Sequence, residues 1–148
     1  MKLLELRPML WVDDVEATID YYKTILGFTE SHFENDWQWG WVRSDGIEIM
    51  FSRPNEHTPY NGPGFTGSFY FNVDNADEWY ERLKDKAIIY YPIEDFEYSM
   101  REFAIKDCNG YILQFGHELF IASLIQKRSP AKPEQDFQRK TKTLLTLG

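Results

Sequence analysis

Apolar and polar positions follow one order along the first third of the chain. After a mostly apolar run over 6–12, Asp13 and Asp14 offer a helix N-cap, and apolar residues recur at helical spacing until Gly27 ends the helix. The stretches 28–33 and 37–43 predict strands, 44–46 predicts a turn, and 47–52 predicts a third strand. The predicted order is β-α-β-β-β.

The same order then returns. A strand over 68–73 precedes a helix over 76–83 that Asp74 caps, and further strands are expected over 87–93, 100–106 and 111–115. Val12-Asp13 matches Val73-Asp74 at a shift of 61, and Asp45-Gly46 matches Asn109-Gly110 at a shift of 64. We therefore predict an α+β fold of two tandem β-α-β-β-β modules. Its expected divisions are a first module over 1–54, a Pro- and Gly-rich linker over 55–67, a second module over 68–119, and a tail over 120–148. A short helix is expected over 118–127, and the rest of the tail is polar and basic.

Composition and charge narrow the classes of function. The chain has 148 residues, 43% hydrophobic and 17% aromatic. Its single cysteine, Cys108, cannot form an intrachain disulfide, and the first residues lack an apolar leader, so we expect a cytoplasmic protein. No apolar run approaches the roughly 20 residues that cross a bilayer, so no membrane role is expected. Residues 1–120 carry 10 basic and 22 acidic side chains, a net charge of −12, which disfavours nucleic acid and attracts cations.

Several motifs resemble those of one known family. The run from Pro8 to Val15, with Tyr21-Tyr22 and Leu26-Gly27-Phe28, resembles the first module of the vicinal oxygen chelate superfamily, which includes glyoxalase I, bleomycin-resistance proteins and extradiol dioxygenases. In the second half, the runs 71–75 and 107–111 support the resemblance. It implies mixed sheets that curl around a shared cavity, the glyoxalase/bleomycin-resistance fold, and a homodimer.

Metal-dependent members of that superfamily bind the ion from the first and last strands of each module. The resemblance places these positions at Arg7, Met50, Ser68 and Gln114, which keep the shifts of 61 and 64. None is a carboxylate or an imidazole, and a guanidinium has no lone pair to donate, so we expect neither a metal nor another cofactor. A shift in register would offer Glu48 or Glu5, but we expect it to turn those side chains away from the cavity.

Aromatic residues favour binding of a small molecule. Trp37, Trp39 and Trp41 alternate on a predicted strand and share one face of it, where they either pack in the core or an interface or stack on a ligand. Aromatic and acidic residues of the second module, over 90–103, extend this surface. The candidate ligand-binding residues are Arg7, Trp37, Trp39, Trp41, Met50, Ser68, Phe103 and Gln114.

The acidity and the altered metal positions resemble the metal-free, antibiotic-sequestering branch of the superfamily. Our leading hypothesis is a homodimer that sequesters a planar or cationic ligand such as an antibiotic, with no catalytic residue assigned. One alternative is a metal-dependent lyase, isomerase or dioxygenase with atypical ligands such as Gln114, Glu48 or His117. Another is a sensor or accessory domain whose tail docks on a partner. Neither the ligand nor the pairing of modules, within one chain or across a dimer, follows from the sequence.

Overall fold

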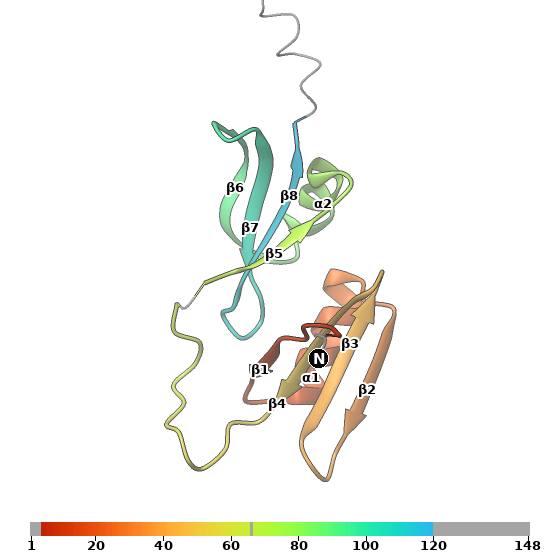
Figure 1. Cartoon of the computed structure of the whole chain (residues 1–148), viewed down its shortest axis with the longest axis vertical. Coiled ribbons are helices and arrows are strands. Elements are labelled where there is room, and N and C mark those ends of the chain that lie inside the picture. Colours follow the sequence, from red (N-terminus) through yellow and green to blue (C-terminus); the bar gives the residue numbers. More distant parts are fainter. Residues whose placement is uncertain (1–3, 66, 120–148) are drawn as a thin grey trace, which may run out of the picture.

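The computed structural model of the chain describes residues 4–65 and 67–119, and it contains two modules with the same order of elements (Figure 1). The first has β1 (Met9–Trp11), α1 (Val15–Tyr21), the π-helical turn η1 (Tyr22–Leu26), β2 (Glu30–Glu34), β3 (Trp39–Ser44) and β4 (Ile47–Ser52). The second has β5 (Phe69–Asn72), α2 (Ala76–Leu83), β6 (Ile88–Phe96), β7 (Met100–Lys106) and β8 (Ile112–Glu118). The predicted α+β fold of two tandem modules is confirmed.

Each module forms one four-stranded mixed sheet. The strand orders are β1-β4-β3-β2 and β5-β8-β7-β6, and in each sheet the first strand is parallel to the last. Met9 pairs with Met50, and Tyr70 pairs with Gln114, so the two pairs differ by the shifts of 61 and 64. The repeat in the sequence is therefore also a repeat in strand register.

Side-chain caps and one glycine set the limits of the helices. The Asp14 carboxylate accepts a 2.9 Å hydrogen bond from the Ala17 amide at the start of α1. Asn75 does the same for the first amides of α2, so the prediction that Asp74 caps this helix is wrong by one residue. Gly27 ends η1 with φ +83°, and the guanidinium of Arg82 occupies the space where a Cβ would lie. Only glycine meets both conditions, because larger residues disfavour a positive φ.

The core lies between the helices and the faces of the sheets that they cover. Alternate strand residues such as Ile49, Phe51 and Phe115 point to the helices and are buried, in one apolar cluster that includes both modules. Each such side chain stabilises the fold by about 1.5–3 kcal/mol through the area it removes from water. On the opposite face of each sheet, the described residues 4–65 and 67–119 place no helix, and we call these the open faces.

Buried hydrogen bonds join the two modules. The Tyr22 hydroxyl donates to Oδ2 of Asp107 at 2.9 Å, and the Tyr111 hydroxyl donates to the Trp11 carbonyl oxygen at 2.8 Å. Asp107 also accepts bonds from the amides of Asn109 and Tyr111, which shapes the turn before β8. The end of the first helix is thus fixed on a turn of the second module.

Some element limits differ from those the sequence predicts. The strand expected over 37–43 begins at Trp39, because the chain turns through Gln38 with φ +48°. Glu118, expected to begin a helix, is the last residue of β8. The rest of that expected helix, and the tail, lie outside the described residues. In the part of the chain that the structure describes, no helix has the length and apolar character needed to cross a membrane.

Candidate functional site

The open face of the first sheet carries aromatic side chains in rows across the strands. The register places Met9, Met50, Trp41 and His32 in one row, and Trp11, Ser52, Trp39 and Glu34 in the next. His32 lies between the two indoles, with ring centroids 6.0 Å from Trp39 and 6.2 Å from Trp41. Trp39 and Trp41 are half-buried, so each presents part of its ring to solvent. They alternate on β3 as predicted, and they lie away from the helix-side core.

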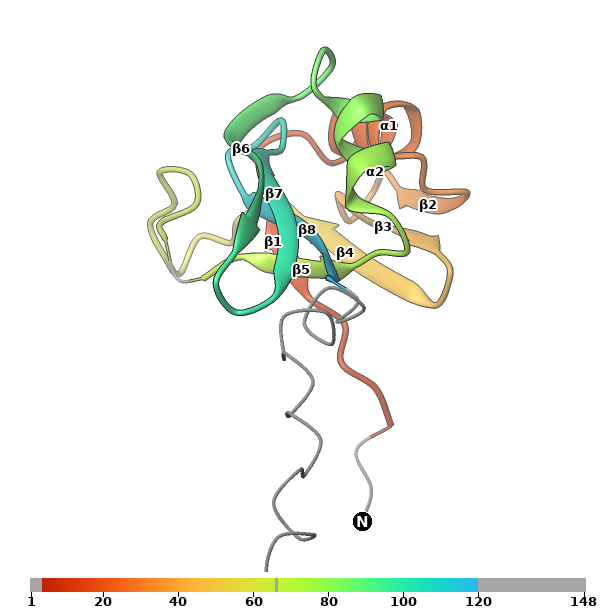
Figure 2. The ribbon, with the colours of Figure 1, turned by 90° about the horizontal axis from the view of Figure 1, so that it is seen from above.

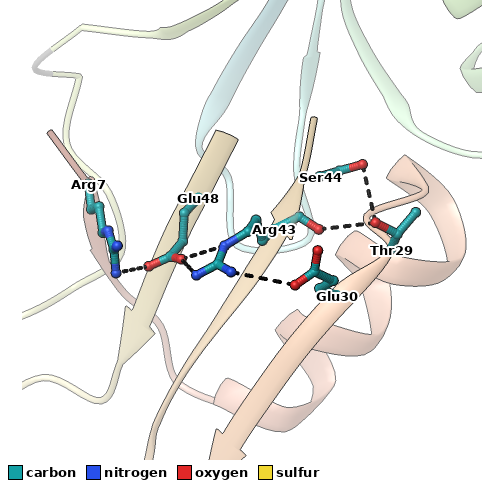
Figure 3. A network of polar contacts seen from close by, with 6 residues as sticks. All are labelled: Arg7, Thr29, Glu30, Arg43, Ser44 and Glu48. Carbon is teal, nitrogen blue, oxygen red and sulfur yellow. Dashed lines mark hydrogen bonds and ion pairs between the residues drawn. The ribbon is translucent and has the colours of Figure 1, made fainter. Parts of the chain in front are cut away.

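A row of alternating charges borders these aromatic rows (Figure 3). Arg7, Glu48, Arg43 and Glu30 come from the segment before β1 and from β4, β3 and β2. Nε and Nη2 of Arg43 donate to Oε2 of Glu48 at 2.9 and 2.5 Å. Oε1 of Glu48 forms an ion pair with Nη1 of Arg7 at 2.6 Å, outside hydrogen-bond geometry. The Arg43 guanidinium also lies 4.7 Å from the centre of the Trp41 ring.

The buried Glu48 organises this row. Its side chain is only 7% exposed, and a buried carboxylate is stable where cations compensate its charge. The expectation that Glu48 turns away from the cavity face is wrong, because Glu48 lies two residues before Met50 and strand side chains repeat every second residue. Arg7 is bound by Glu48 and by Glu5, so it is not a free anchor for an anionic ligand.

The open face of the second sheet contains a different buried carboxylate. Glu102 on β7 is 2% exposed and accepts hydrogen bonds from three tyrosine hydroxyls: Tyr70 at 2.6 Å, Tyr91 at 2.9 Å and Tyr98 at 2.8 Å. Burial, and after it the hydrogen bond to Glu102, raises the pKa of Tyr70 above its usual value. Burial likewise raises the pKa of Tyr91, so both phenols remain protonated donors at ordinary pH.

Two of the predicted site residues belong to this second network. Ser68 donates a short hydrogen bond from Oγ to Oε1 of Gln114. Nε2 of Gln114 then donates to the Tyr91 hydroxyl at 2.7 Å, which in turn donates to Glu102. The two positions that the resemblance assigns to the second module are therefore in contact, with Ser68 directly before β5 and Gln114 on β8. Both ends of the Gln114 amide are bonded to protein groups.

A glycine on the central strand β8 makes the contact between Tyr70 and Glu102 possible. Tyr70 is on β5 and Glu102 on β7, so the Tyr70 side chain must cross β8. It does so over Gly116, which pairs with Glu102. A Cβ at position 116 would overlap the Tyr70 hydroxyl and lie 2.9 Å from the Glu102 Cβ. Any larger residue at position 116 would separate the Tyr70 hydroxyl from the Glu102 carboxylate.

Two candidate residues do not lie on the open faces. Trp37 is in the turn before β3 and is 80% exposed, so only two of the three indoles share the predicted stripe. Phe103 is fully buried on the helix side of β7, where its ring contacts those of Tyr80 and Phe115. Its placement in a ligand wall is wrong, because Glu102 and Ala104 take the open-face positions on either side of it.

The sequence reasoning included Tyr91 and Tyr98 in the aromatic surface of the second module but missed Glu102 and Tyr70. One indication was available, since a charged residue within the apolar strand 100–106 requires a compensating partner. The partners themselves come from β5, β6 and the turn after β6. Only the folded chain brings them together.

The donor groups at the resemblance's metal positions do not fit a divalent ion. Arg7 and Met50 lie in the first module and Ser68 and Gln114 in the second, and these groups are a guanidinium, a thioether, a hydroxyl and a bonded amide. Across residues 4–65 and 67–119, no three His, Cys, Asp or Glu side chains lie close enough to hold a metal.

The atypical ligands considered for a metal enzyme also lie apart. Glu48 is held by two arginines, and Gln114 is on the other sheet. His117 lies within β8, and its Nδ1 accepts a 2.8 Å hydrogen bond from the Ala76 amide at the start of α2. They do not form one donor set. Burial raises the pKa of the Cys108 thiol to about 11, so nucleophilic chemistry there has no support either.

Among the grooves where the described parts of the two modules meet, two lie beside Ser68. One of about 340 Å³ lies between Pro8 and Glu48 of the first module and Ser68 and Tyr70 of the second. The other, of about 850 Å³, is lined by residues that include Trp11, Tyr60, Ser68, Tyr90 and Lys106. Ser68 lines both grooves. The grooves therefore connect the neighbourhoods of the two buried carboxylates, while Trp39 and Trp41 lie on the open sheet outside them.

Paired β-α-β-β-β modules, each with an open face opposite its helix, define a glyoxalase-type α+β protein. The chain belongs to the Glyoxalase/Bleomycin resistance protein/Dioxygenase superfamily, whose family model matches residues 6–115. Members of this superfamily bind small ligands and are often dimers. A search of curated proteins found no match.

Solved structures show the same fold at low sequence identity. TioX from Micromonospora sp. ML1 is 20% identical with a TM-score of 0.63, and the match covers 78% of this chain and 99% of that protein. A lactoylglutathione lyase from Agrobacterium tumefaciens is 19% identical with a TM-score of 0.61, covering 77% and 92%. A superfamily member from Sphaerobacter thermophilus DSM 20745 is 22% identical with a TM-score of 0.66, covering 79% and 98%. These similarities concern the fold.

Proposed function

We propose that this protein is a small-molecule binding protein that sequesters a planar ligand, such as an antibiotic, on the open face of its first sheet. One observation carries the proposal: Trp39 and Trp41 are half-buried on a sheet face that no helix covers, beside Met50 and an ionic row. A flat, partly exposed indole pair offers stacking surface to a planar heteroaromatic, worth about 1 kcal/mol for each good contact.

The ionic row supports this role by fixing the floor of the site. Arg43 is held by Glu48 and lies over Trp41, which limits the orientations open to both side chains. A site whose side chains are already oriented loses less entropy when it binds a ligand. The ligand would therefore meet a prepared aromatic surface.

We further propose that the protein acts in the cytoplasm as a homodimer, in which a second copy closes over the open faces. Apolar side chains ahead of and within β1 support this, because Leu4, Leu6 and Met9 are 90%, 91% and 52% exposed. The first described residues extend away from both sheets (Figure 2), whereas Arg7 and Pro8, directly before β1, contact β4. Exposed apolar surface of this kind marks a contact with a further chain. Sedimentation at micromolar concentration should give twice the mass of one chain, and a monomer would refute this part of the proposal.

Tryptophan substitutions test the binding role. The native protein is titrated with a panel of planar and cationic antibiotics, bleomycin included, and binding is followed by tryptophan fluorescence. Trp39→Ala should weaken the best binder about fivefold, the loss expected for one stacking contact of about 1 kcal/mol. Trp37→Ala is the matched control, because this indole is 80% exposed in the turn off the sheet face.

The proposal fails if no member of the panel binds, or if Trp37→Ala weakens binding as much as Trp39→Ala does. Urea unfolding of both variants separates binding from folding. If Trp39→Ala lowers stability and leaves the affinity unchanged, the indole belongs to the packing of the sheet and not to a ligand site.

A further inference from the structure

Glu102 is a buried carboxylate without a basic partner. In the parts of the chain that the structure describes, Arg7 and Arg43 are bound to Glu48, Arg101 to Asp77 and Asp95, and no ion pair includes Glu102. The charge of a buried carboxylate is normally compensated by a nearby cation. Here, three tyrosine hydroxyls provide hydrogen bonds but no positive charge.

Three tyrosine rings converge on this carboxylate through their hydroxyls. We call Glu102 with Tyr70, Tyr91 and Tyr98 the Glu102 cage. Tyr70 is 39% exposed and Tyr98 is 61% exposed, so rings that donate to Glu102 through their hydroxyls also face solvent. Phe96 stacks on Tyr98 with ring centroids 5.2 Å apart and adds a further aromatic face.

We propose that the Glu102 cage binds an ammonium group of the ligand, with the tyrosine rings around the cation and the Glu102 carboxylate as its counter-charge. The inference rests on the proposed function, since it gives the sequestered molecule a positive charge and a place for it. Ring faces carry negative electrostatic potential and attract cations within about 6 Å.

The geometry favours an ammonium group over other ligands. A metal ion would need several donor side chains, and among the described residues no three His, Cys, Asp or Glu side chains lie close enough to hold one. An anion would meet the charge of Glu102 and of the exposed Glu94, its partner on β6. An alkylated ammonium group requires no lone pair and no displaced hydrogen bond, because it binds against ring faces.

The location is distinct from the positions that the family resemblance assigns to metal ligands. Those positions lie on the first and last strands of each module, whereas Glu102 lies on β7. Gln114 connects the two, since its amide donates to Tyr91 and, at 3.5 Å, to Glu102. A cation in the cage would thus lie beside the groove that Ser68 and Tyr70 line.

Choline and its uncharged analogue 3,3-dimethylbutan-1-ol test the inference, because the two have nearly the same shape. Protein with ¹³C-labelled tyrosine rings is titrated with each probe and followed by NMR, with the Tyr98 signal assigned from Tyr98→Phe. We expect choline to shift the ring signals of the cage and to bind about tenfold more tightly than the alcohol. Glu102→Gln should bring the ratio of the two affinities close to one.

Glu56→Gln is the matched control, because Glu56 is exposed between β4 and β5 and its loss changes the net charge equally. It should leave the ratio unchanged. Equal affinity for both probes in the native protein, or a ratio that Glu102→Gln does not alter, would overturn the inference. If Glu102→Gln does not fold, Tyr98→Leu takes its place as the test variant, because the Tyr98 ring is exposed and its removal should be tolerated. In this variant choline should bind several-fold more weakly, while the affinity for the alcohol should not change.

The outcome separates this inference from the proposed function. Choline binding is measured from the NMR signals of tyrosines on the second sheet. Antibiotic binding is measured from the fluorescence of tryptophans on the first sheet. A panel that fails to bind while choline binds as expected would overturn the proposed function alone. Binding of the panel without any preference for choline would overturn only the Glu102 cage.

Discussion

The hydrogen bond between Tyr22 and Asp107 should make a large contribution to stability, because it joins the two modules inside the core. Tyr22 is fully buried at the start of η1, and its hydroxyl donates to Oδ2 of Asp107 at 2.9 Å. Asp107 is 2% exposed. In Tyr22→Phe the ring remains, while a buried carboxylate oxygen loses its donor.

The magnitude follows from that asymmetry. A hydrogen bond to a charged group contributes about 1.5–3 kcal/mol, and a buried acceptor without a donor retains its cost of desolvation. We expect Tyr22→Phe to lower the free energy of unfolding by about 2 kcal/mol. For a chain of this size, the melting temperature should then fall by roughly 6–8 °C.

Urea unfolding followed by far-ultraviolet circular dichroism measures the difference, provided that the dependence of the free energy on urea stays the same. Tyr90→Phe is the control, since Tyr90 is 53% exposed and no hydrogen bond of its hydroxyl is present in the described part of the chain. The control should lie within about 0.5 kcal/mol of the native protein. A Tyr22→Phe variant as stable as the control would refute the role of this bond.

Three further variants or reactions probe other parts of the structure. Phe103→Ala should cost about 3–5 kcal/mol in urea unfolding, because the ring is fully buried in the core; a loss below 1 kcal/mol would contradict its placement there. Gly116→Ala should separate Tyr70 from Glu102, so its tyrosine NMR signals should resemble those of Tyr70→Phe, and unchanged Tyr70 signals would count against the crossing over β8. Cys108 is exposed, but desolvation of its thiol and the charge of Asp107 raise its pKa to about 11. It should react with iodoacetamide at pH 8 roughly a hundredfold more slowly than a free thiol and faster as the pH rises toward 11; reaction at the rate of free cysteine would contradict the raised pKa.

Much of the fold could be predicted from the sequence because the determinants are local. Asp14 caps α1 through a bond to an amide three residues away, as predicted, whereas the cap of α2 is Asn75 in place of the predicted Asp74. Gly27 ends η1 because its own φ is positive. The repeat, seen as shifts of 61 and 64, reappears as the pairs Met9–Met50 and Tyr70–Gln114.

The candidate site was predicted only in part, for two different reasons. Trp39 and Trp41 share a face because alternation on a strand is a local property, but the position of Trp37 depended on where β3 begins. The alternation of side chains along a strand also does not show which of its two faces is buried in the core. Phe103 and Glu102 are adjacent on β7, and only the position of α2 decides which of them points into the core.

The sequence by itself determined the two modules, the cap and the end of the first helix, and the alternation of Trp39 and Trp41 on β3, because each depends on neighbours along the chain. The tertiary structure alone decided the two charged networks. Glu48 meets arginines from β3 and from the segment before β1, and Glu102 meets tyrosines from β5, β6 and the turn after β6. A buried charge is stable only with compensating partners. The local sequence does not show which partners folding brings from other strands.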